Sequence, residues 1–236
     1  MYVTREYDVF QNKLNDLESS LSLIDQSLKL SKALHKDFSL KEINLARSIL
    51  VRNVYISVYE LFIQYSKSKV ISYIKEHISV GDIGKVIQFL KETMKTMGTE
   101  RLSLEFDDLK SVIESPTTML EEKIVHLFSN RREKKTYINS IEKLMALELE
   151  QELKEDITLF MAMRHVFVHG NGEITNEWRK AYSKPLFRNN IRLKKKKGEK
   201  LFLPTDYMHL KLAINTYSSF CKILEKEIKT PTEAGV

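Results

Sequence analysis

The sequence is poor in residues that interrupt helices. Its 236 residues include seven glycines and four prolines, and this scarcity predicts long, uninterrupted helices rather than many strands and tight turns. Cys221 is the only cysteine, which excludes an intramolecular disulfide framework and a cysteine-rich zinc site. We expect Cys221 to be a small buried residue of the last helix.

Long apolar runs are also missing. No stretch approaches the roughly eighteen consecutive apolar residues of a membrane-spanning helix, and the first residues, MYVTREYD, lack the apolar core of a secretion signal. These absences predict a soluble, cytoplasmic protein without a membrane partner. Hydrophobic residues make up 42% of the chain and charged residues 30%, which indicates a globular protein. We expect one domain over residues 1–236.

Positive charge is concentrated in one segment. The net charge is +6, yet residues 179–200 hold ten lysines and arginines against Glu199 alone, a balance of 10 − 1 = +9. The rest of the chain therefore sums to 6 − 9 = −3. We interpret the segment as a surface for RNA, with binding that depends steeply on salt; the alternative is a solvated loop. The residues assigned to RNA contact here are Arg179, Lys180, Arg188, Arg192, Lys194, Lys195, Lys196 and Lys197.

Three aromatic residues, Trp178, Tyr182 and Phe187, interleave with these charges. Each is able to stack on an unpaired base. Each is equally suited to packing in the core, so the sequence leaves both interpretations open.

Apolar residues recur at spacings of three and four in four long stretches, which predicts an all-α fold. We expect helices over residues 5–34, 39–78, 134–169 and 206–229. Ser39 followed by Glu42 forms a capping box that begins the second helix, and the stretch Pro204-Thr205-Asp206 caps the last. Periodicity leaves open whether 134–169 is one helix or two joined near 148–155.

The remaining parts are less regular. We expect shorter helices between residues 82 and 128, and we interpret 98–132 as a family-specific insertion. Two short strands, 190–193 and 200–203, are predicted to form a small hairpin inside a basic insertion over 179–203.

The second helix contains an apolar run over residues 49–63, and we expect it to be the buried central helix. Glu60 stands inside that run. We interpret it as an ion-pair partner or cap for a neighbouring group, with a functional carboxylate as the alternative.

The most informative stretch is MRHVFVHGNG, residues 163–172. Arg164 lies three and four residues after apolar positions, so it projects from the apolar side of its helix and needs an anionic partner or a polar cleft. His169 follows at the helix end, just before Gly170. An arginine neutralises a scissile phosphate, and a histidine titrating near neutrality moves a proton. The pair therefore suits cleavage of RNA without metal; a structural arginine and histidine are the alternative.

This all-helical chain, with Arg-x-x-x-x-His closing its penultimate long helix, resembles the HEPN superfamily (higher eukaryotes and prokaryotes nucleotide-binding domains). The text from Arg164 to Ile174 is similar to the ribosomal-L-PSP-associated branch in particular, in which Asn and Gly follow the histidine and a hairpin precedes a C-terminal helix. The resemblance covers roughly residues 40–230 in architecture, and its specific part is 164–174, within the motif region 155–175.

The resemblance implies a metal-independent endoribonuclease without a cofactor. It implies a homodimer in which the motif helices of two copies meet, so that two arginines and two histidines line one composite cleft. Carried over by position, Arg164 and His169 are the catalytic pair, His165 takes the polar position after the arginine, and Asn171 joins the RNA-binding set. The family also implies a role as a toxin or phage-defence effector, with an antitoxin or defence partner protein.

This sequence departs from the family at two places. His165 stands where the family often has Asn. Asn171 stands where some members carry a tyrosine that accepts AMP, so adenylylation at that position is not expected here. Two further alternatives stay open: a non-catalytic HEPN-like module that binds nucleotides, RNA or protein, and a metal site formed by His165 and His169 at helical spacing.

Overall fold

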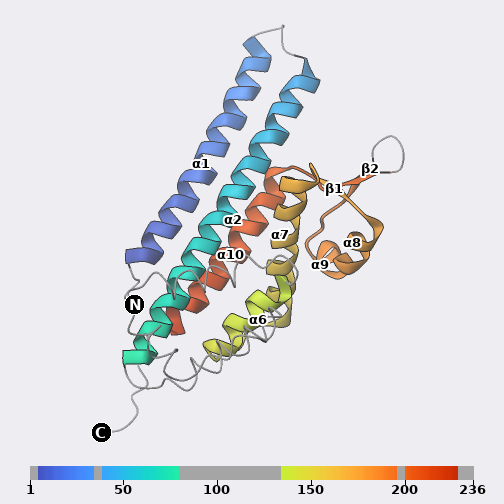
Figure 1. Cartoon of the computed structure of the whole chain (residues 1–236). Helices are drawn as coiled ribbons and strands as arrows, with labels where there is room; N and C mark the ends of the chain where they lie inside the picture. Colours follow the sequence, from blue (N-terminus) through green and yellow to red (C-terminus); the bar gives the residue numbers. More distant parts are fainter. Residues whose placement is uncertain (1–4, 35–38, 80–133, 196–199, 228–236) are drawn as a thin grey trace. The chain divides into compact units, whose positions relative to one another are not determined.

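The computed structural model describes residues 5–34, 39–79, 134–195 and 200–227, and these are mostly helical (Figure 1). With the labels of Figure 1, the helices are α1 (Arg5–Leu34), α2 (Leu40–Ser79), α6 (Lys134–Leu144), α7 (Gln151–His169), α8 (Asn176–Ala181), α9 (Ser183–Arg188) and α10 (Tyr207–Glu227). The strands are β1 (Glu173–Ile174), β2 (Lys194–Lys195) and β3 (Leu201–Phe202). A mostly helical fold with a small hairpin before the last helix is confirmed.

Two helices begin where their capping residues predict. At the start of α2, the amide of Ser39 donates to Glu42 Oε2 over 2.9 Å, and the amide of Glu42 donates to Ser39 Oγ over 3.2 Å. At the start of α10, Asp206 Oδ1 accepts a hydrogen bond from the amide of His209 over 3.1 Å. Each side chain satisfies backbone donors that have no acceptor within the helix.

The stretch 134–169 is two helices rather than one. Helix α6 ends at Leu144, and Ala146 adopts a left-handed backbone with φ of 51°. The carbonyl of Glu142 accepts from the amide of Leu147 over 2.9 Å, while its carboxylate accepts from Leu149 over 3.3 Å. These bonds close α6 before α7 begins at Gln151.

The described residues group into two compact units. Unit 1 consists of residues 1–62 and 151–221, and unit 2 of residues 63–150 and 222–236. The divisions fall inside α2 and α10, and the single domain expected from the sequence stays a prediction.

The core of unit 1 brings together α1, the first half of α2, α7 and most of α10. Figure 1 shows α1 and α2 side by side as a long antiparallel pair. Tyr217 of α10 stacks on Phe62 of α2 with ring centroids 4.2 Å apart, and it meets the edge of Phe160 of α7 at 6.4 Å. Offset and edge-to-face pairs of this kind are favourable beyond the area that they bury. This aromatic centre holds α2, α7 and α10 together.

Helix α2 is less buried than its apolar run predicts. Val51, Tyr55, Val58 and Phe62 are fully covered, but Ile49 is exposed and other apolar positions of the run are half-buried. The expectation of a buried central helix is met on one face only, because within the described residues its neighbours cover that face rather than the whole surface.

Unit 2 has an ion pair in its interior. Lys69 Nζ lies 3.0 Å from Glu225 Oε2, and both side chains are buried. Tyr65 donates its hydroxyl to the same oxygen over 2.7 Å. Because charge is costly to bury without partners, this carboxylate is stabilised by an ammonium and a hydroxyl together.

The three strands form one small antiparallel sheet in the order β1-β3-β2. Strand β3 lies inside the predicted range 200–203, but β2 begins after 190–193. That earlier stretch instead closes α9: Asn190 has a φ of 57°, and the amide of Ile191 donates to the carbonyl of Leu186 over 2.9 Å.

Helices α8 and α9 were not predicted. Thr175 caps α8 by accepting from the amide of Trp178 over 3.1 Å. Proline usually interrupts helices, but Pro185 lies in the first turn of α9, where its missing amide hydrogen costs no helical hydrogen bond.

The expected short helices between residues 82 and 128 and the insertion 98–132 lie outside the described residues. Among the helices that are described, none combines the length and the apolar character needed to cross a bilayer.

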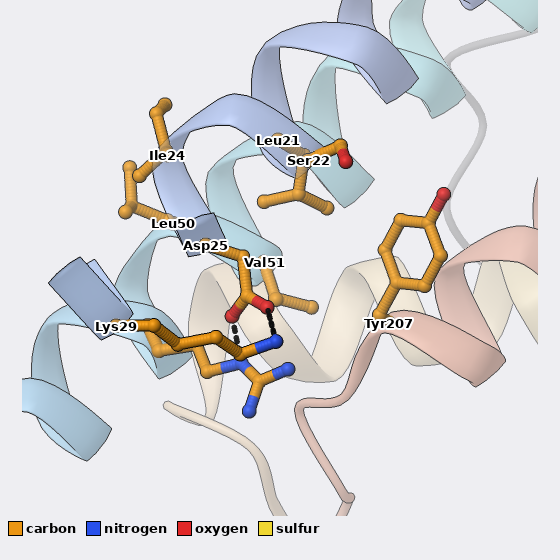
Figure 2. A pocket seen from close by; sticks show the side chains of 9 residues that line it. Leu21, Ser22, Ile24, Asp25, Lys29, Leu50, Val51 and Tyr207 are labelled. Atoms are coloured by element: carbon orange, nitrogen blue, oxygen red, sulfur yellow. Dashed lines mark ion pairs between the residues drawn. The ribbon is translucent and has the colours of Figure 1, made fainter. Parts of the chain in front are cut away.

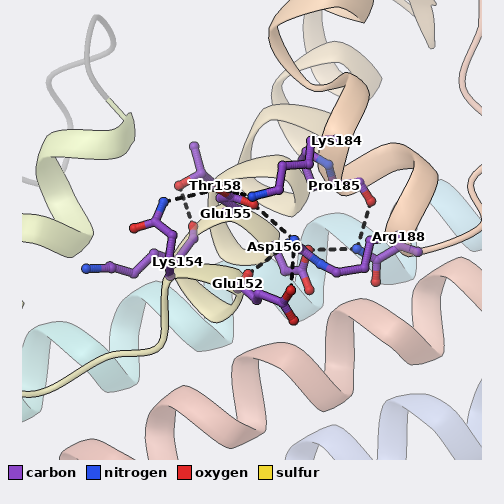
Figure 3. A network of polar contacts seen from close by, with 10 residues as sticks. Glu152, Lys154, Glu155, Asp156, Thr158, Lys184, Pro185 and Arg188 are labelled. Atoms are coloured by element: carbon purple, nitrogen blue, oxygen red, sulfur yellow. Dashed lines mark hydrogen bonds and ion pairs between the residues drawn. The ribbon is translucent and has the colours of Figure 1, made fainter.

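A cluster of charges fastens α9 to the first turns of α7 (Figure 3). Arg188 donates to Glu155 over 3.0 Å, to Asp156 over 2.5 Å and to the carbonyl of Glu152 over 3.0 Å. Lys184 also reaches Glu155, over 3.2 Å. We call this group the Arg188 clasp. It positions α8, α9 and the residues that follow against a rigid helix.

We expect the Arg188 clasp to weaken in acid. The hydrogen bond from Arg188 is the main reason that the pKa of Glu155 is lowered from 4.5 to about 2, with Gln151 and Lys184 contributing. A lowered carboxyl pKa stabilises the fold above pH 4.5, and that contribution is lost as the pH falls towards 2. Urea unfolding at pH 7, 4 and 3 measures the loss. Glu155→Gln should be less stable than wild type at pH 7, by about 1 kcal/mol or less, and should lose less on acidification. An equal loss in both proteins contradicts this role.

Candidate active site

The motif ends α7 with a tight turn that requires a residue without a side chain at one position and a left-handed backbone at the next two. The amides of Gly170 and Gly172 both donate to the carbonyl of Val166, over 2.9 and 3.1 Å. A side chain at Gly170 would lie 3.0 Å from the Glu173 carbonyl. Asn171 and Gly172 have φ angles of 50° and 87°, a region where asparagine and glycine are tolerated best.

The same turn connects the motif to the sheet. The carbonyl of Gly172 accepts from the amide of Leu203, just after β3, over 2.8 Å. Strand β1 begins at the next residue and pairs with β3. The end of α7 is therefore held from two sides, by its own helix and by the strands.

Arg164 makes an ion pair within the chain. Its Nη2 lies 2.6 Å from Glu60 Oε1 on α2, and its guanidinium carbon lies 4.9 Å from the centre of the Tyr59 ring. The side chains are 24% and 46% exposed, so the pair lies at the surface rather than in the dry core. The predicted role of Glu60 as an ion-pair partner is confirmed.

The charges of this pair affect the pKa of Tyr59. Burial raises the pKa of its phenol, the positive charge of Arg164 opposes that rise, and the negative charge of Glu60 adds to it. The phenol is therefore neutral across the physiological range, and its ring presents a face to the guanidinium in a cation–π contact.

The two histidines of the motif are neighbours. The rings of His165 and His169 have centroids 4.6 Å apart and are tilted by 47°. His169 is exposed and His165 half-buried, while Met163, Val166 and Phe167 are buried. The last turns of α7 thus expose Val168 and His169 and leave Arg164 and His165 partly exposed. We call Arg164, His165, Val168 and His169 the motif strip.

Arg52 is a neighbour of the motif that the sequence did not reveal. It extends from α2, and its Nη1 donates to the side-chain oxygen of Asn171. The signal was present, since Arg52 interrupts the same apolar run that made Glu60 conspicuous. Asn171, assigned to RNA from the sequence, uses its side-chain oxygen to tie the turn to α2.

The residues expected to contact RNA divide into two groups. Arg188 is engaged in the Arg188 clasp by Glu152, Glu155 and Asp156. Its charge is already matched, so we remove it from the RNA-binding set. The remaining cations that the structure describes are exposed and form no ion pair with another described residue; they are Arg179, Lys180, Arg192, Lys194 and Lys195. Lys196 and Lys197 lie outside the described residues.

A metal site was the alternative for His165 and His169. Within residues 5–34, 39–79, 134–195 and 200–227, no group of three or more histidine, cysteine or acidic side chains is arranged to hold a metal ion. The histidine pair gains no third ligand from these parts of the chain.

A pocket of about 270 Å³ lies elsewhere, between α1, α2 and α10 (Figure 2). Asp25 lines it and pairs with Lys29 over 2.9 Å and with Arg47 over 2.7 Å. Tyr207, on another side, donates to Glu18, and this bond raises the pKa of the Tyr207 phenol to about 12. No residue of the motif strip contributes to the lining, so we do not connect the pocket to the RNA cleavage expected from the sequence.

Comparison of the chain with protein families, with curated proteins and with solved structures finds no match.

We expect Asn171→Ala to destabilise the protein by about 1–3 kcal/mol, because alanine disfavours a positive φ and removes the acceptor of Arg52. Asn171→Gly removes the acceptor but tolerates the backbone, so its loss should be smaller. Asn171→Asp keeps both features and adds a charge facing Arg52, so it should match or exceed wild type. Urea unfolding of the three variants provides the measurement, and an aspartate variant no better than alanine contradicts this account.

Proposed function

We propose that the protein is a metal-independent endoribonuclease of the HEPN type. The observation that carries the proposal is the motif strip, in which an exposed His169 touches His165 one helical turn away, beside a partly exposed Arg164. A cation and two side chains able to transfer protons thus lie within the last two turns of α7. The five exposed cations that follow in the chain supply sites for phosphates.

The chemistry follows from the groups present. One imidazole removes the proton of a ribose 2′-hydroxyl, and the resulting oxygen attacks the adjacent phosphorus. The bond from phosphorus to the 5′-oxygen breaks, and a protonated imidazole supplies the proton that this oxygen requires. Arg164 stabilises the charge that develops on the phosphoryl oxygens. The products are a 2′,3′-cyclic phosphate and a free 5′-hydroxyl.

The proposal includes a homodimer, as the family resemblance implies. The motif strip of one copy then faces that of a second copy, and two arginines and four imidazoles line a shared cleft. Val168, an exposed apolar residue between the histidines, supports a contact at this place. A toxin or phage-defence role, with an antitoxin or other partner protein, belongs to the same proposal.

The ion pair between Arg164 and Glu60 favours a second candidate function. If this contact is purely structural, the chain is a non-catalytic module that binds RNA through its basic segment. We prefer the first function because the pair lies at the surface, where a phosphate is able to approach the guanidinium while Glu60 holds it in place. A guanidinium also carries five N–H donors, of which Glu60 takes one.

We expect the purified protein to cleave single-stranded RNA in EDTA and to leave the 2′-deoxy analogue intact. Arg164→Ala and His169→Ala should each lower the rate at least about 100-fold, since each removes a transition-state contact. Arg47→Ala is the matched control, because it removes another arginine that pairs with a carboxylate. Intact RNA under every condition contradicts the proposal, whereas equal losses in the control attribute the effect to stability.

We expect Glu60→Gln to lower kcat about tenfold with little change in KM. Glu60 fixes the direction of Arg164, so its loss leaves a mobile guanidinium that still attracts phosphate but stabilises the transition state less well. Single-turnover cleavage with Glu60→Gln and Glu60→Asp measures this, and the aspartate should recover part of the rate. A faster Glu60→Gln enzyme shows instead that Glu60 inhibits Arg164.

A further inference from the structure

Phe187 is the most exposed large apolar side chain among the described residues, at 89%. It belongs to α9, a helix whose other apolar residues, Pro185 and Leu186, are buried. Packing in the core, one of the two roles open to Phe187 from the sequence, is therefore excluded.

The neighbours of Phe187 hold its ring outwards. Leu186 is buried on one side, while Arg188 on the other is bonded to α7 through the clasp (Figure 3). Asn189 adds a hydrogen bond to Asp156 over 2.7 Å. Successive helical residues point about 100° apart, so with both neighbours facing the protein, the ring between them faces solvent. It is presented on a fixed support.

All the charged residues near Phe187 in the sequence are cationic. Residues 179–195 contain seven lysines and arginines and no acidic residue. Lys184 and Arg188 face the carboxylates of α7, and the other five are exposed without an ion pair to a described residue. One apolar ring among unmatched cations does not resemble a protein-docking face, which has a larger apolar centre.

Local hydrogen bonds fix the path of the chain on both sides of Phe187. The amides of Asn190 and Ile191 donate to the carbonyls of Phe187 and Leu186, over 3.0 and 2.9 Å. The chain therefore turns back on α9 and places Arg192 beside its end. On the N-terminal side, the amide of Tyr182 donates to the carbonyl of Trp178, and the amide of Leu186 donates to the carbonyl of Tyr182. The backbone therefore keeps a helical path from Arg179 to Phe187.

We propose that Phe187 is a stacking platform for an unpaired base of the RNA, with Arg179, Lys180, Arg192, Lys194 and Lys195 binding the flanking phosphates. The identity of the strand as RNA rests on the proposed function. The platform makes the substrate class single-stranded or looped RNA, because a base inside a continuous duplex has no free face to offer.

The test measures binding separately from cleavage. The full-length His169→Ala protein is titrated with a fluorescein-labelled unstructured 12-nucleotide RNA, its duplex form, and the DNA strand of the same sequence. Phe187→Ala in this background should weaken single-strand binding at least about tenfold, with duplex binding unchanged. Phe187→Leu should resemble Phe187→Ala, and Phe187→Trp should retain affinity. Met208→Ala, at another exposed apolar residue (67%), is the matched control.

A second measurement reports stacking directly. In a Trp178→Phe background, Phe187→Trp provides the single tryptophan, and its fluorescence should be quenched by the RNA strand and unaffected by the duplex. Unchanged affinity in Phe187→Ala, or an unquenched tryptophan, overturns the platform. An equal loss on RNA and DNA strands supports it and assigns recognition to base and phosphate rather than ribose.

The results separate the two proposals. Cleavage by the wild type together with Phe187-independent binding overturns the platform and leaves the ribonuclease standing. If binding requires Phe187 but no condition gives cleavage, the ribonuclease proposal fails and the stacking platform stands. Because Phe187 is almost fully exposed, its substitution should leave the unfolding midpoint unchanged, which circular dichroism checks.

Discussion

Two reciprocal arginine contacts between α2 and α7 determine where the motif lies. Arg52 of α2 reaches the turn after α7 at Asn171, and Arg164 of α7 reaches back to Glu60 of α2. The partners are eight residues apart on α2 and seven on the other side, and their order is reversed, as antiparallel helices require. Each contact supplies one acceptor to a guanidinium on a mostly apolar helix, so the two together fix the rotation and the end of α7.

The rest of unit 1 around the motif depends on this arrangement. With α7 fixed, Phe160 on its buried face meets Tyr217, which stacks on Phe62, and the motif strip is left facing outwards. The left-handed pair Asn171 and Gly172 then directs the chain into β1. A register change of one residue in α7 would break both arginine contacts and rotate the histidines by about 100°.

Sequence reasoning succeeded where the signal is local. The two helix caps each join residues three positions apart: Ser39 with Glu42, and Asp206 with the amide of His209. The scarcity of glycine and proline correctly predicted long helices. Sequence reasoning failed where residues distant in the sequence determine the local structure. Pro185 is compatible with a loop or with a first helical turn, and the carboxylates of α7 that hold α9 select the second. The burial of α2 depends on what covers it, which periodicity does not report.

The site shows the same division. Arg164 was recognisable as a charge among apolar residues, and its need for an anionic partner is met by Glu60. Arg52 is equally conspicuous, but its partner lies 119 residues away in sequence, and folding alone brings the two together. Arg188 and Arg179 are indistinguishable in the sequence, yet Arg188 meets the acidic first turns of α7 and Arg179 meets solvent. Catalysis, the homodimer and the defence role stay predictions.

One helix therefore connects the two places that we assign to RNA. The first turns of α7 hold the Arg188 clasp, and with it the Phe187 ring, whereas its last turn carries His169. From Asp156 to His169 the helix rises 1.5 Å per residue, or about 20 Å. A strand that stacks one base on Phe187 and presents a phosphate to the motif strip of the same copy must therefore follow the length of this helix. Under the two proposals, the separation between anchored base and broken bond is set by a rigid helix rather than a loop, and the register along the RNA is fixed without reading any base edge.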